Sequence, residues 1–360
     1  MFRRFPLVAL AAAATASTLA IAACSSSSST SSGSTTAQGG SSSGMPTVTM
    51  MVGGIDKQIY LPYQLAQQLG FYKKYGVNMV LSTEQAGGVG AETAMASGQV
   101  NMAGAWYTHT IDFQLKGKAV EDVAQLSGAP GERIMCAKGS NIDSPAQWRG
   151  KSIGVTDLGS GTDQLTLYLA ARYHLTTKDF SRVGAGAGST MIAAIQHGKV
   201  ACGMTTQPTV TAIEKLGIGY SAFDLATTGG VQKWLGGDVP TAGVLALTSW
   251  VNANKATVQK VVDALVATMH WINTHTAAQI ADAMPPAFVS NSVVTKADYI
   301  TALTQDKTQF LPDGMMPAGG PQVVLSIDKL AGVVTGPVDL GVTYTNSYAI
   351  AANKLEGFSG

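Results

Sequence analysis

Short apolar segments alternate with helical segments along most of the chain, and this alternation constrains the fold more than any single motif. Glycine ends several of the helical segments, and the connections between segments are short. Strands that alternate with helices in this way predict an α/β fold, with a parallel sheet covered by helices. In the first part, the predicted strands lie at 47–52, 77–81, 100–103 and 120–126, and the predicted helices lie at 61–69, 87–95 and 106–115.

The segment Lys151–Leu169 is the clearest strand-turn-helix unit. Ser152–Val155 reads as a buried strand, and a glycine-containing turn leads from Asp157 to Thr162 into a helix. Such a turn leaves the first backbone N–H groups of the helix free to bind an anionic or strongly polar group. An ordinary capped turn has the same composition, so the pattern by itself leaves both interpretations open.

A weak internal repeat in the sequence indicates two lobes with the same order of helices and strands. A helix ends at Ala94–Gly98 and a strand follows from Val100, and the same order recurs at Ala194–Gly198 and Val200. Helix, glycine and strand often follow one another by chance, but the position of both copies in successive α/β units favours a two-lobed design. Further strands are predicted at 133–137, 152–155, 182–183, 200–204 and 241–247, and further helices at 165–171, 189–196, 254–272, 298–310 and 321–330.

The N-terminus is typical of a lipoprotein. Arg3 and Arg4 precede an apolar stretch that ends at Ala23, and the residues before Cys24 resemble a bacterial lipobox. Residues 1–23 are therefore predicted to be a signal peptide, and acylated Cys24 is predicted to anchor the protein outside the cytoplasm. An uncleaved anchor or a plain secretion signal is the alternative. The serine-rich segment 24–46 is predicted to be a flexible tether.

Composition excludes several classes of function. The formal net charge is +1, which gives no reason to expect a nucleic-acid partner. The five histidines are scattered, and the chain contains no nucleophile elbow, zinc-binding helix or metal-ligand spacing, so neither a cofactor nor a metal is predicted. Beside Cys24, the chain has only Cys136 and Cys202; both lie in apolar, strand-like segments, and we favour free buried thiols over a disulfide.

Three stretches resemble the solute-binding proteins of ABC importers, in the nitrate/taurine/sulfonate branch. They are a helix and turn from Tyr63 to Asn78, the run from Pro145 to Val155, and Gly198–Gly203 with the following Pro208. The order of these stretches is consistent over roughly Thr47–Asn273. Two positions depart from the family pattern: Ala201 replaces the usual aspartate, and the matching first-lobe position is Asn101. No cysteine-rich motif of the related pyrimidine-synthesising enzymes is present.

The resemblance implies the type II periplasmic-binding-protein fold, in which two lobes, each a mixed sheet flanked by helices, are joined by two crossover strands. The first lobe would comprise residues 47–135 and 237–360, and the second lobe residues 136–236. A small ligand would bind between the lobes at the carboxyl ends of the strands. Closure about the hinge would trap the ligand, and a monomeric binding protein would deliver it to a membrane permease and its ATPase.

The candidate ligand-binding residues follow predicted strands in both lobes. Trp106 and Tyr107 could stack on a planar ligand, although lobe packing explains Trp106 equally well. Arg133, Lys57 and His109 are the only cationic groups near the inferred cleft, and His109 is more typical of a satisfied core or surface histidine. The full set is Asp56, Gln58, Gly87, Gly88, Trp106, Tyr107, Ser160, Gly161, Thr162, Thr205, Thr206 and Gln207.

The ligand is predicted to be a small organic anion or a heterocycle, such as a sulfonate, a carboxylate or a pyrimidine-like molecule. Few basic residues surround the inferred cleft, but backbone amides and hydroxyls can hold a sulfonate or carboxylate without a full counter-charge. Two other functions stay open. The protein could be a ligand sensor that reports to a membrane partner, or an enzyme built on the same fold.

Overall fold

The computed structural model describes residues 44–84 and 89–358. The predicted signal peptide, the tether up to Ser43, Cys24, Gly87 and Gly88 lie outside this range. Within it, no helix has the length and apolar character needed to cross a membrane.

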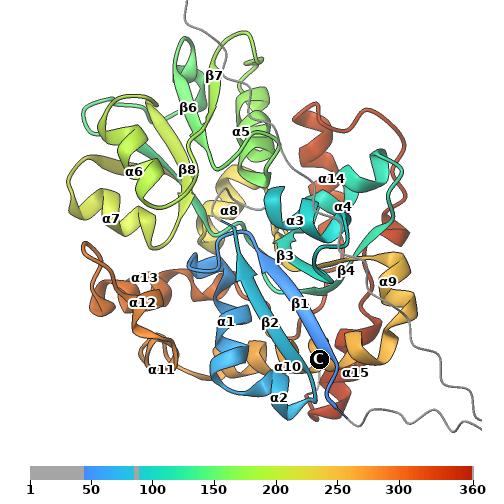
Figure 1. Cartoon of the computed structure of the whole chain (residues 1–360). Helices are drawn as coiled ribbons and strands as arrows, with labels where there is room; N and C mark the ends of the chain where they lie inside the picture. Colours follow the sequence, from blue (N-terminus) through green and yellow to red (C-terminus); the bar gives the residue numbers. More distant parts are fainter. Residues whose placement is uncertain (1–43, 85–88, 359–360) are drawn as a thin grey trace, which may run out of the picture. The chain divides into compact units, whose positions relative to one another are not determined.

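The first sheet has the order β2-β1-β3-β10-β4 (Figure 1). Strands β1, β2 and β3 are parallel, whereas β10 is antiparallel to both β3 and β4. Its strands are β1 (Thr47–Val52), β2 (Asn78–Thr83), β3 (Met102–Trp106), β4 (Val120–Gln125) and β10 (Ala242–Leu247).

The second sheet has the order β7-β6-β8-β5-β9, and here β5 is the antiparallel strand beside β8 and β9. Its strands are β5 (Glu132–Ala137), β6 (Ser152–Val155), β7 (Ser181–Gly184), β8 (Cys202–Thr206) and β9 (Gly219–Leu225). We call the first and second sheets, with their covering helices, the first and second lobes. The predicted α/β class with two mixed sheets is confirmed, although the alternation by itself predicted only parallel strands.

The antiparallel strands follow from the path of the chain. The chain leaves the first sheet after β4 and enters the second at β5, and it returns from β9 to β10. The first strand after each crossing, β5 in the second sheet and β10 in the first, is antiparallel to the strands on both sides of it. The exact lobe boundaries stay predictions.

Helices cover both faces of the first sheet (Figure 1). The apolar stripe predicted on residues 254–272 is confirmed, because its valines, Leu265, Met269 and Ile272 are all buried. Asn254 stands at the start of that helix, but its side chain donates to the carbonyl of Trp250 and does not cap it. The helices of this lobe are α1 (Leu61–Gln68), α2 (Phe71–Lys74), α3 (Val89–Ala96), α4 (Thr108–Leu115), α9 (Thr248–Ala253), α10 (Lys255–Thr274) and α15 (Ser347–Leu355).

The second sheet lies between α5 and α8 on one face and α6 and α7 on the other (Figure 1). Met191 of α6 packs directly on β8, where a Cβ atom on Gly203 would lie 2.3 Å from its sulfur. The sequence patterns predicted α5 and α6 but missed α7, β9 and α8. The helices are α5 (Gly161–Arg172), α6 (Ser189–Gln196), α7 (Thr209–Lys215) and α8 (Thr228–Leu235).

The C-terminal part adds short helices that reach toward the second lobe. Lys215 of α7 and Asp298 of α13 form an ion pair at 2.5 Å, and the Arg133 guanidinium of β5 binds both carboxylate oxygens of Asp306 at 2.7 and 2.8 Å. Helix α14 packs against α5. These helices are α11 (Ala277–Ala283), α12 (Pro286–Val289), α13 (Lys296–Asp306) and α14 (Gly320–Leu330).

The internal repeat has a matching hydrogen-bond pattern in the two lobes. The carbonyl of Ala94 accepts from the backbone N–H groups of residues 99 and 100 at 2.9 and 3.4 Å. The carbonyl of Ala194 accepts from residues 199 and 200 at 2.9 and 3.2 Å. Gly98 and Gly198 both have positive φ, which is the usual way in which glycine ends a helix. The two copies therefore enter β3 and β8 through the same turn.

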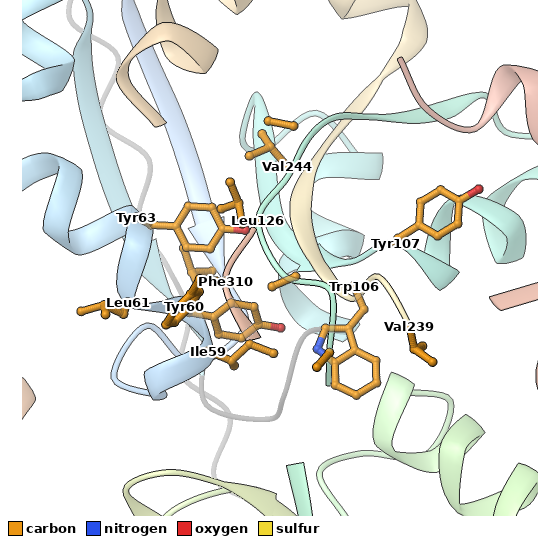
Figure 2. Packing of buried hydrophobic residues seen from close by; sticks show 14 of the residues in the cluster. Ile59, Tyr60, Leu61, Tyr63, Trp106, Tyr107, Leu126, Val239, Val244 and Phe310 are labelled. Atoms are coloured by element: carbon orange, nitrogen blue, oxygen red, sulfur yellow. The ribbon is translucent and has the colours of Figure 1, made fainter. Parts of the chain in front are cut away.

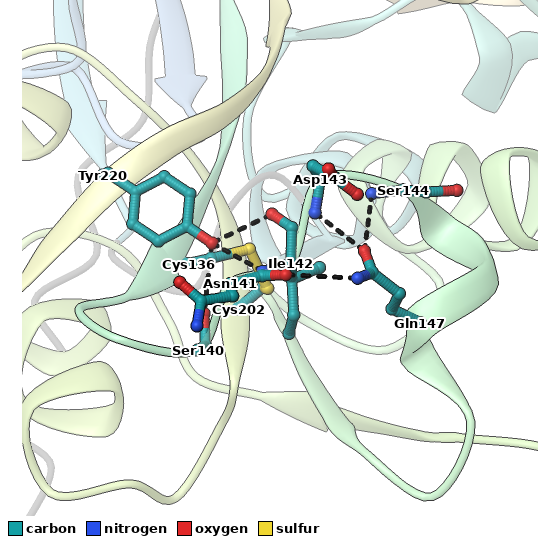
Figure 3. The surroundings of a disulfide bond; sticks show 9 residues. All are labelled: Cys136, Ser140, Asn141, Ile142, Asp143, Ser144, Gln147, Cys202 and Tyr220. Carbon is teal, nitrogen blue, oxygen red and sulfur yellow. Dashed lines mark hydrogen bonds between the residues drawn. A yellow bond between two sulfur atoms is a disulfide. The ribbon is translucent and has the colours of Figure 1, made fainter.

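A disulfide joins Cys136 and Cys202 (Figure 3), so the prediction of two free thiols was wrong. The two cysteines are register partners in antiparallel β5 and β8, and their Cα atoms are 3.9 Å apart. Their strand-like surroundings were predicted, but the pairing of β5 with β8 was not. Beside the disulfide, the Tyr220 hydroxyl donates to the Ile142 carbonyl at 2.9 Å and accepts from its N–H at 2.7 Å (Figure 3).

Candidate functional site: a polar cavity between the lobes

A narrow cavity of about 10 Å³, close to the space of one water molecule, lies between the lobes. Its walls come from the segment that follows β1, from the ends of β3 and β6, from the starts of β5 and α5, and from α3 and α4. We call it the polar cavity. Its lining residues are Lys57, Ile59, Tyr60, Glu92, Trp106, His109, Glu132, Thr156, Gly161 and Thr162.

Trp106 is the last residue of β3, and its indole crosses from the first lobe to the second. The six-membered ring lies on the backbone of Gly161, where a Cβ atom would be only 2.0 Å from Trp106 Cε3. The indole nitrogen faces the Tyr60 hydroxyl (Figure 2). Because residue 161 has no side chain, the Trp106 indole of the first lobe can pack on the first turn of α5 in the second lobe.

The turn before α5 forms the wall contributed by the second lobe. Thr162 Oγ1 accepts from the backbone N–H of Thr156 at 3.0 Å, and Ser160 Oγ accepts from that of Asp163 at 3.3 Å. The three hydroxyls of Thr156, Ser160 and Thr162 also lie 2.8–3.1 Å from one another. Because this network already uses the hydroxyls, the turn offers a ligand mainly the unbonded backbone N–H groups at the start of the helix.

Two carboxylate oxygens on the cavity wall are buried and have no hydrogen-bond partner among the described residues. They are Glu92 Oε1, from α3, and Glu132 Oε2, from the first residue of β5. The His109 Nε2 atom is 3.1 Å from Glu92 Oε1, but the two groups are not aligned as a hydrogen bond. A buried polar atom without a partner is rare in native proteins and indicates a missing partner.

Burial shifts the titration of the histidine and the glutamate in this wall. Burial acts to lower the pKa of His109, but the charges of Glu92 and Asp112 outweigh it and raise the pKa to about 9. The Nδ1 atom lies 2.9 Å from Asp112 Oδ2. Burial raises the pKa of Glu92 to about 8, against the opposing effect of His109. The imidazole is therefore cationic at neutral pH and faces a carboxyl group with a high proton affinity.

Lys57 and Glu132 form a second buried pair. Lys57 Nζ donates to the Gly53 carbonyl at 2.8 Å, and burial lowers the pKa of this ammonium against the charge of Glu132. Burial raises the pKa of Glu132 to about 7, against the charges of Lys57 and Arg133. The cavity thus contains two acidic and two basic groups, with no excess of positive charge.

Direct hydrogen bonds also join the lobes beside the cavity. The backbone N–H of Gln58 donates to the Gln207 carbonyl at 2.9 Å. Thr108 of α4 donates to Gln164 of α5 at 2.8 Å, and the amide of Gln164 donates to Asp112 at 2.7 Å. The walls of the cavity are therefore held together by contacts of the protein itself.

Three of the predicted ligand-binding residues meet in the polar cavity: Trp106, Gly161 and Thr162. Ser160 is buried beneath them as the cap of α5, and Gln58 and Gln207 meet only through their backbones. Asp56 lines a different and larger cavity, of about 290 Å³, with Ser189 and Thr209 among its other lining residues.

The remaining described candidates face other surroundings. Tyr107 points away from the cavity (Figure 2), and its hydroxyl lies 2.6 Å from that of Thr343. Thr205 and Thr206 belong to β8 itself, rather than to the loop after it, and the Thr206 hydroxyl donates to the Gly131 carbonyl at 2.7 Å.

Sequence reasoning missed Tyr60, Glu92, Glu132 and Thr156, whereas His109 is a buried histidine with carboxylate partners, in line with its interpretation as a satisfied histidine. One usable signal was Glu92, a single charge in the otherwise small and apolar helix of α3. In a chain with only 12% charged residues, such a glutamate is a good candidate for a buried functional group. Among the described residues, no group of His, Cys, Asp and Glu side chains is arranged to hold a metal ion.

Comparison with protein families matches residues 59–279 to the family described as NMT1/THI5 like. This range covers more than half of the chain. The protein belongs to the NMT1/THI5-like family. The matched range includes the whole polar cavity except Lys57, and the resemblance noted in the sequence is confirmed.

The curated relatives of this NMT1/THI5-like protein include two yeast enzymes. They are the 4-amino-5-hydroxymethyl-2-methylpyrimidine phosphate synthases THI12 and THI5 of Saccharomyces cerevisiae, each 28% identical over 142 residues. The match spans 39% of this chain and 40% of each synthase, so it covers less than half of the relatives' length.

Solved structures are similar over a longer range. A protein of Bordetella bronchiseptica RB50 has a TM-score of 0.79 and 28% identity, over 86% of this chain and 98% of that one. A ligand-binding component of an ABC-type import system from Staphylococcus aureus has a TM-score of 0.66 and 16% identity, over 85% and 99%. The alkanesulfonate-binding protein SsuA of Xanthomonas axonopodis has a TM-score of 0.66 and 16% identity, over 83% and 98%. These likenesses confirm the two-lobed fold.

Proposed function

We propose that this protein is the solute-binding component of an ABC importer, which holds a small molecule in the polar cavity and delivers it to a membrane permease and its ATPase. Support comes from the cavity between the lobes and from structural neighbours whose names state ligand binding for import. The protein would act outside the cytoplasm as a monomer, anchored by lipid on Cys24, without a cofactor and without catalysing a reaction.

The ligand would be held mainly by residues of the polar cavity. Trp106 and Tyr60 provide aromatic surface, Glu92 and Glu132 provide acceptors, and the start of α5 provides backbone N–H groups. Among the sequence candidates, Trp106, Gly161 and Thr162 belong to this set. The others stay predictions.

The proposed ligand is a planar nitrogen heterocycle that carries N–H donors, such as an aminopyrimidine. The observation that carries this choice is Glu132 Oε2, a buried oxygen without a hydrogen-bond partner, together with Glu92 Oε1, which is ion-paired with His109 but accepts no aligned hydrogen bond; both lie beside the Trp106 indole. An amino group or ring N–H supplies the donors that these oxygens lack. A sulfonate or nitrate carries no N–H donor that could reach these oxygens. The aminopyrimidine in the names of the yeast relatives is consistent with this choice.

An enzyme is the alternative that those relatives raise. The chain contains three cysteines in all and lacks the cysteine-rich motif of the pyrimidine-synthesising enzymes. A ligand sensor shares the fold and the cavity, and the neighbouring genes distinguish it: permease and ATPase genes support import, whereas a kinase gene supports sensing.

Calorimetric titration of the full chain in detergent micelles tests the proposal, with 4-aminopyrimidine, a sulfonate, a carboxylate and nitrate as probes. We expect binding of 4-aminopyrimidine alone, weakened about 10- to 100-fold in Glu132→Ala, because hydrogen bonds to charged groups contribute about 1.5–3 kcal/mol. Binding of the sulfonate or nitrate alone would contradict the proposed ligand. Conversion of 4-aminopyrimidine during the titration would contradict the binding-protein assignment.

A further inference from the structure

A second cavity, of about 20 Å³, lies on the other side of Trp106. We call it the apolar cavity. It shares Trp106 and Gly161 with the polar cavity, so the indole is the partition between the two. Figure 2 shows Ile59 and Tyr60 on one side of the indole and Val239 on the other.

The walls of the apolar cavity come from both lobes. Leu165 of α5 faces Val324 and Ile327 of α14, and the segment Val239–Pro240 leads back toward β10. All of these apolar residues except Pro240 belong to the main hydrophobic core. The cavity is therefore a gap in the core between α5 and α14, with the indole as one of its walls.

The polar groups at the edge of this cavity already have partners. The Thr108 hydroxyl lies 2.8 Å from Gln164 Oε1 and 2.7 Å from Asp328 Oδ2. The Thr241 hydroxyl donates to the Ala129 carbonyl at 2.7 Å. Burial raises the pKa of Asp328 to about 7, against the hydrogen bond from Thr108, which disfavours a full charge there. A group that enters this space meets apolar side chains and satisfied polar atoms.

We infer that the apolar cavity is a second subsite, which takes an uncharged alkyl substituent of the same ligand whose heterocyclic ring occupies the polar cavity. This inference rests on the proposed function. Because Trp106 and Gly161 line both cavities, a ring in the first cavity lies next to the second, and only the indole separates a short substituent on that ring from the apolar walls. The ligand is therefore bipartite, with a hydrogen-bonding ring and an apolar arm.

Binding of an alkyl arm has a characteristic size dependence. Each methylene group that moves from water into an apolar space should tighten binding about threefold to fourfold. The gain should stop once the arm fills the gap between α5 and α14. A polar substituent of the same size should give no gain, because the surrounding polar atoms are already paired.

The test is a calorimetric series with 4-aminopyrimidine and its methyl, ethyl and propyl derivatives at ring carbons 2, 5 and 6. The full chain is compared with Leu165→Phe, which fills the apolar cavity, and with Leu167→Phe, a matched change at a half-buried position of the same helix that does not line it. Ile327→Phe repeats the filling from α14 if Leu165→Phe lowers the folded fraction.

At one of the three ring positions, we expect each added methylene group to increase the affinity about threefold to fourfold, both in the wild type and in Leu167→Phe. Both filling variants should bind the parent 4-aminopyrimidine as the wild type does and lose the gain. Binding of the parent without any gain, or a gain that both filling variants retain, would overturn the second subsite and leave the proposed function standing. Failure of the parent to bind would overturn both.

Discussion

The two lobes share one plan but contribute different chemistry to the cavity between them. Their sheets correspond strand for strand, with β2-β1-β3-β10-β4 matching β7-β6-β8-β5-β9, and each has one antiparallel strand where the chain crosses over. The first lobe contributes Lys57, Glu92 and His109 and the Tyr60 and Trp106 rings. The second contributes the small residues at the start of α5, and Glu132 from the crossover itself.

In this duplicated fold, the two lobes contribute different parts of ligand binding. Charged and aromatic groups of the first lobe, together with Glu132 from the crossover, define which ligand is recognised, whereas the backbone of Gly161 on the other lobe allows the two surfaces to meet. The second lobe also holds the only disulfide between described residues. We therefore expect changes in the first lobe and at Glu132 to alter recognition, and other changes in the second lobe to alter closure or stability.

The largest expected effect concerns the disulfide. Replacing both Cys136 and Cys202 with alanine should lower the free energy of unfolding by about 2–4 kcal/mol, because the bridge closes a long loop with a sequence separation of 66. Urea unfolding measures the change. Ligand affinity should stay within about twofold, since neither sulfur lines the polar cavity. A large loss of affinity with unchanged stability would contradict the conclusion that the disulfide of the second lobe contributes to stability and not to recognition.

The next effect concerns closure. Gly161→Val should weaken binding of 4-aminopyrimidine about 100-fold, because the new side chain occupies the space of the Trp106 indole and overpacking costs about 1–3 kcal/mol. Calorimetry measures the affinity, and thermal unfolding checks the fold. Gly229→Val is the matched control, since a Cβ atom there has no neighbour within 4 Å. Equal affinities in the two variants would show that the indole contact is dispensable.

A paired substitution compares recognition by the two lobes directly. Glu92→Ala removes a buried acceptor of the first lobe and should weaken binding about 10- to 100-fold. Thr162→Ala removes a hydroxyl that is already bonded within the second lobe and should change affinity by no more than about fivefold, while lowering stability by about 1 kcal/mol. Calorimetry and urea unfolding measure both. The reverse order of affinities would place recognition in the second lobe.

The last expected effect is the pH dependence of the unliganded protein. The pKa of Glu132 is raised to about 7 and that of Glu92 to about 8, so the folded state keeps protons that the unfolded state releases above about pH 4.5. Stability should therefore fall as pH rises from about 5, by at most about 1.4 kcal/mol per pH unit for each carboxyl group, and the slope should lessen above about pH 7, where Glu132 has lost its proton in the folded state as well.

Urea unfolding at pH 5, 6.5 and 8 measures how the free energy of unfolding changes with pH. Glu92→Gln should reduce this slope by the contribution of one carboxyl group. The raised pKa of His109, about 9, acts in the same direction, since its stabilising proton is lost as pH rises toward 9. A stability that rises over this range would show that the carboxyl groups are ionised and well paired in the folded protein.

Much of the fold could be predicted from local patterns. The strand Ser152–Val155 and the helix Ser189–Gln196 have the predicted bounds, because apolar runs bounded by glycine and polar turns define them locally. The antiparallel direction of β5 and β10 could not be predicted in this way, because it depends on which sheet each strand joins. The disulfide escaped prediction for the same reason.

The candidate site was predictable only where it follows a strand end. Trp106, Gly161 and Thr162 lie at such positions and meet in the cavity, whereas Tyr107, one residue after Trp106, points to the opposite side. Glu92 and Glu132 lie inside a helix and at a strand start, where their burial depends on packing between elements distant in the sequence. Only the place of Glu92 as the single charge of α3 gives a local signal, and no local pattern distinguishes Glu132 from a solvent-exposed glutamate.

Mass spectrometry of the ligand that co-purifies with the native protein tests the central claim most directly. The protein is isolated from its own cells without added ligand, its mass is measured under native conditions, and the bound molecule is released by denaturation and fragmented. We expect a small nitrogen heterocycle with N–H donors, which is lost from Glu92→Ala isolated in the same way. A sulfonate or another oxyanion bound to the wild type would contradict the assignment of Glu92 and Glu132 as the acceptors that recognise the ligand.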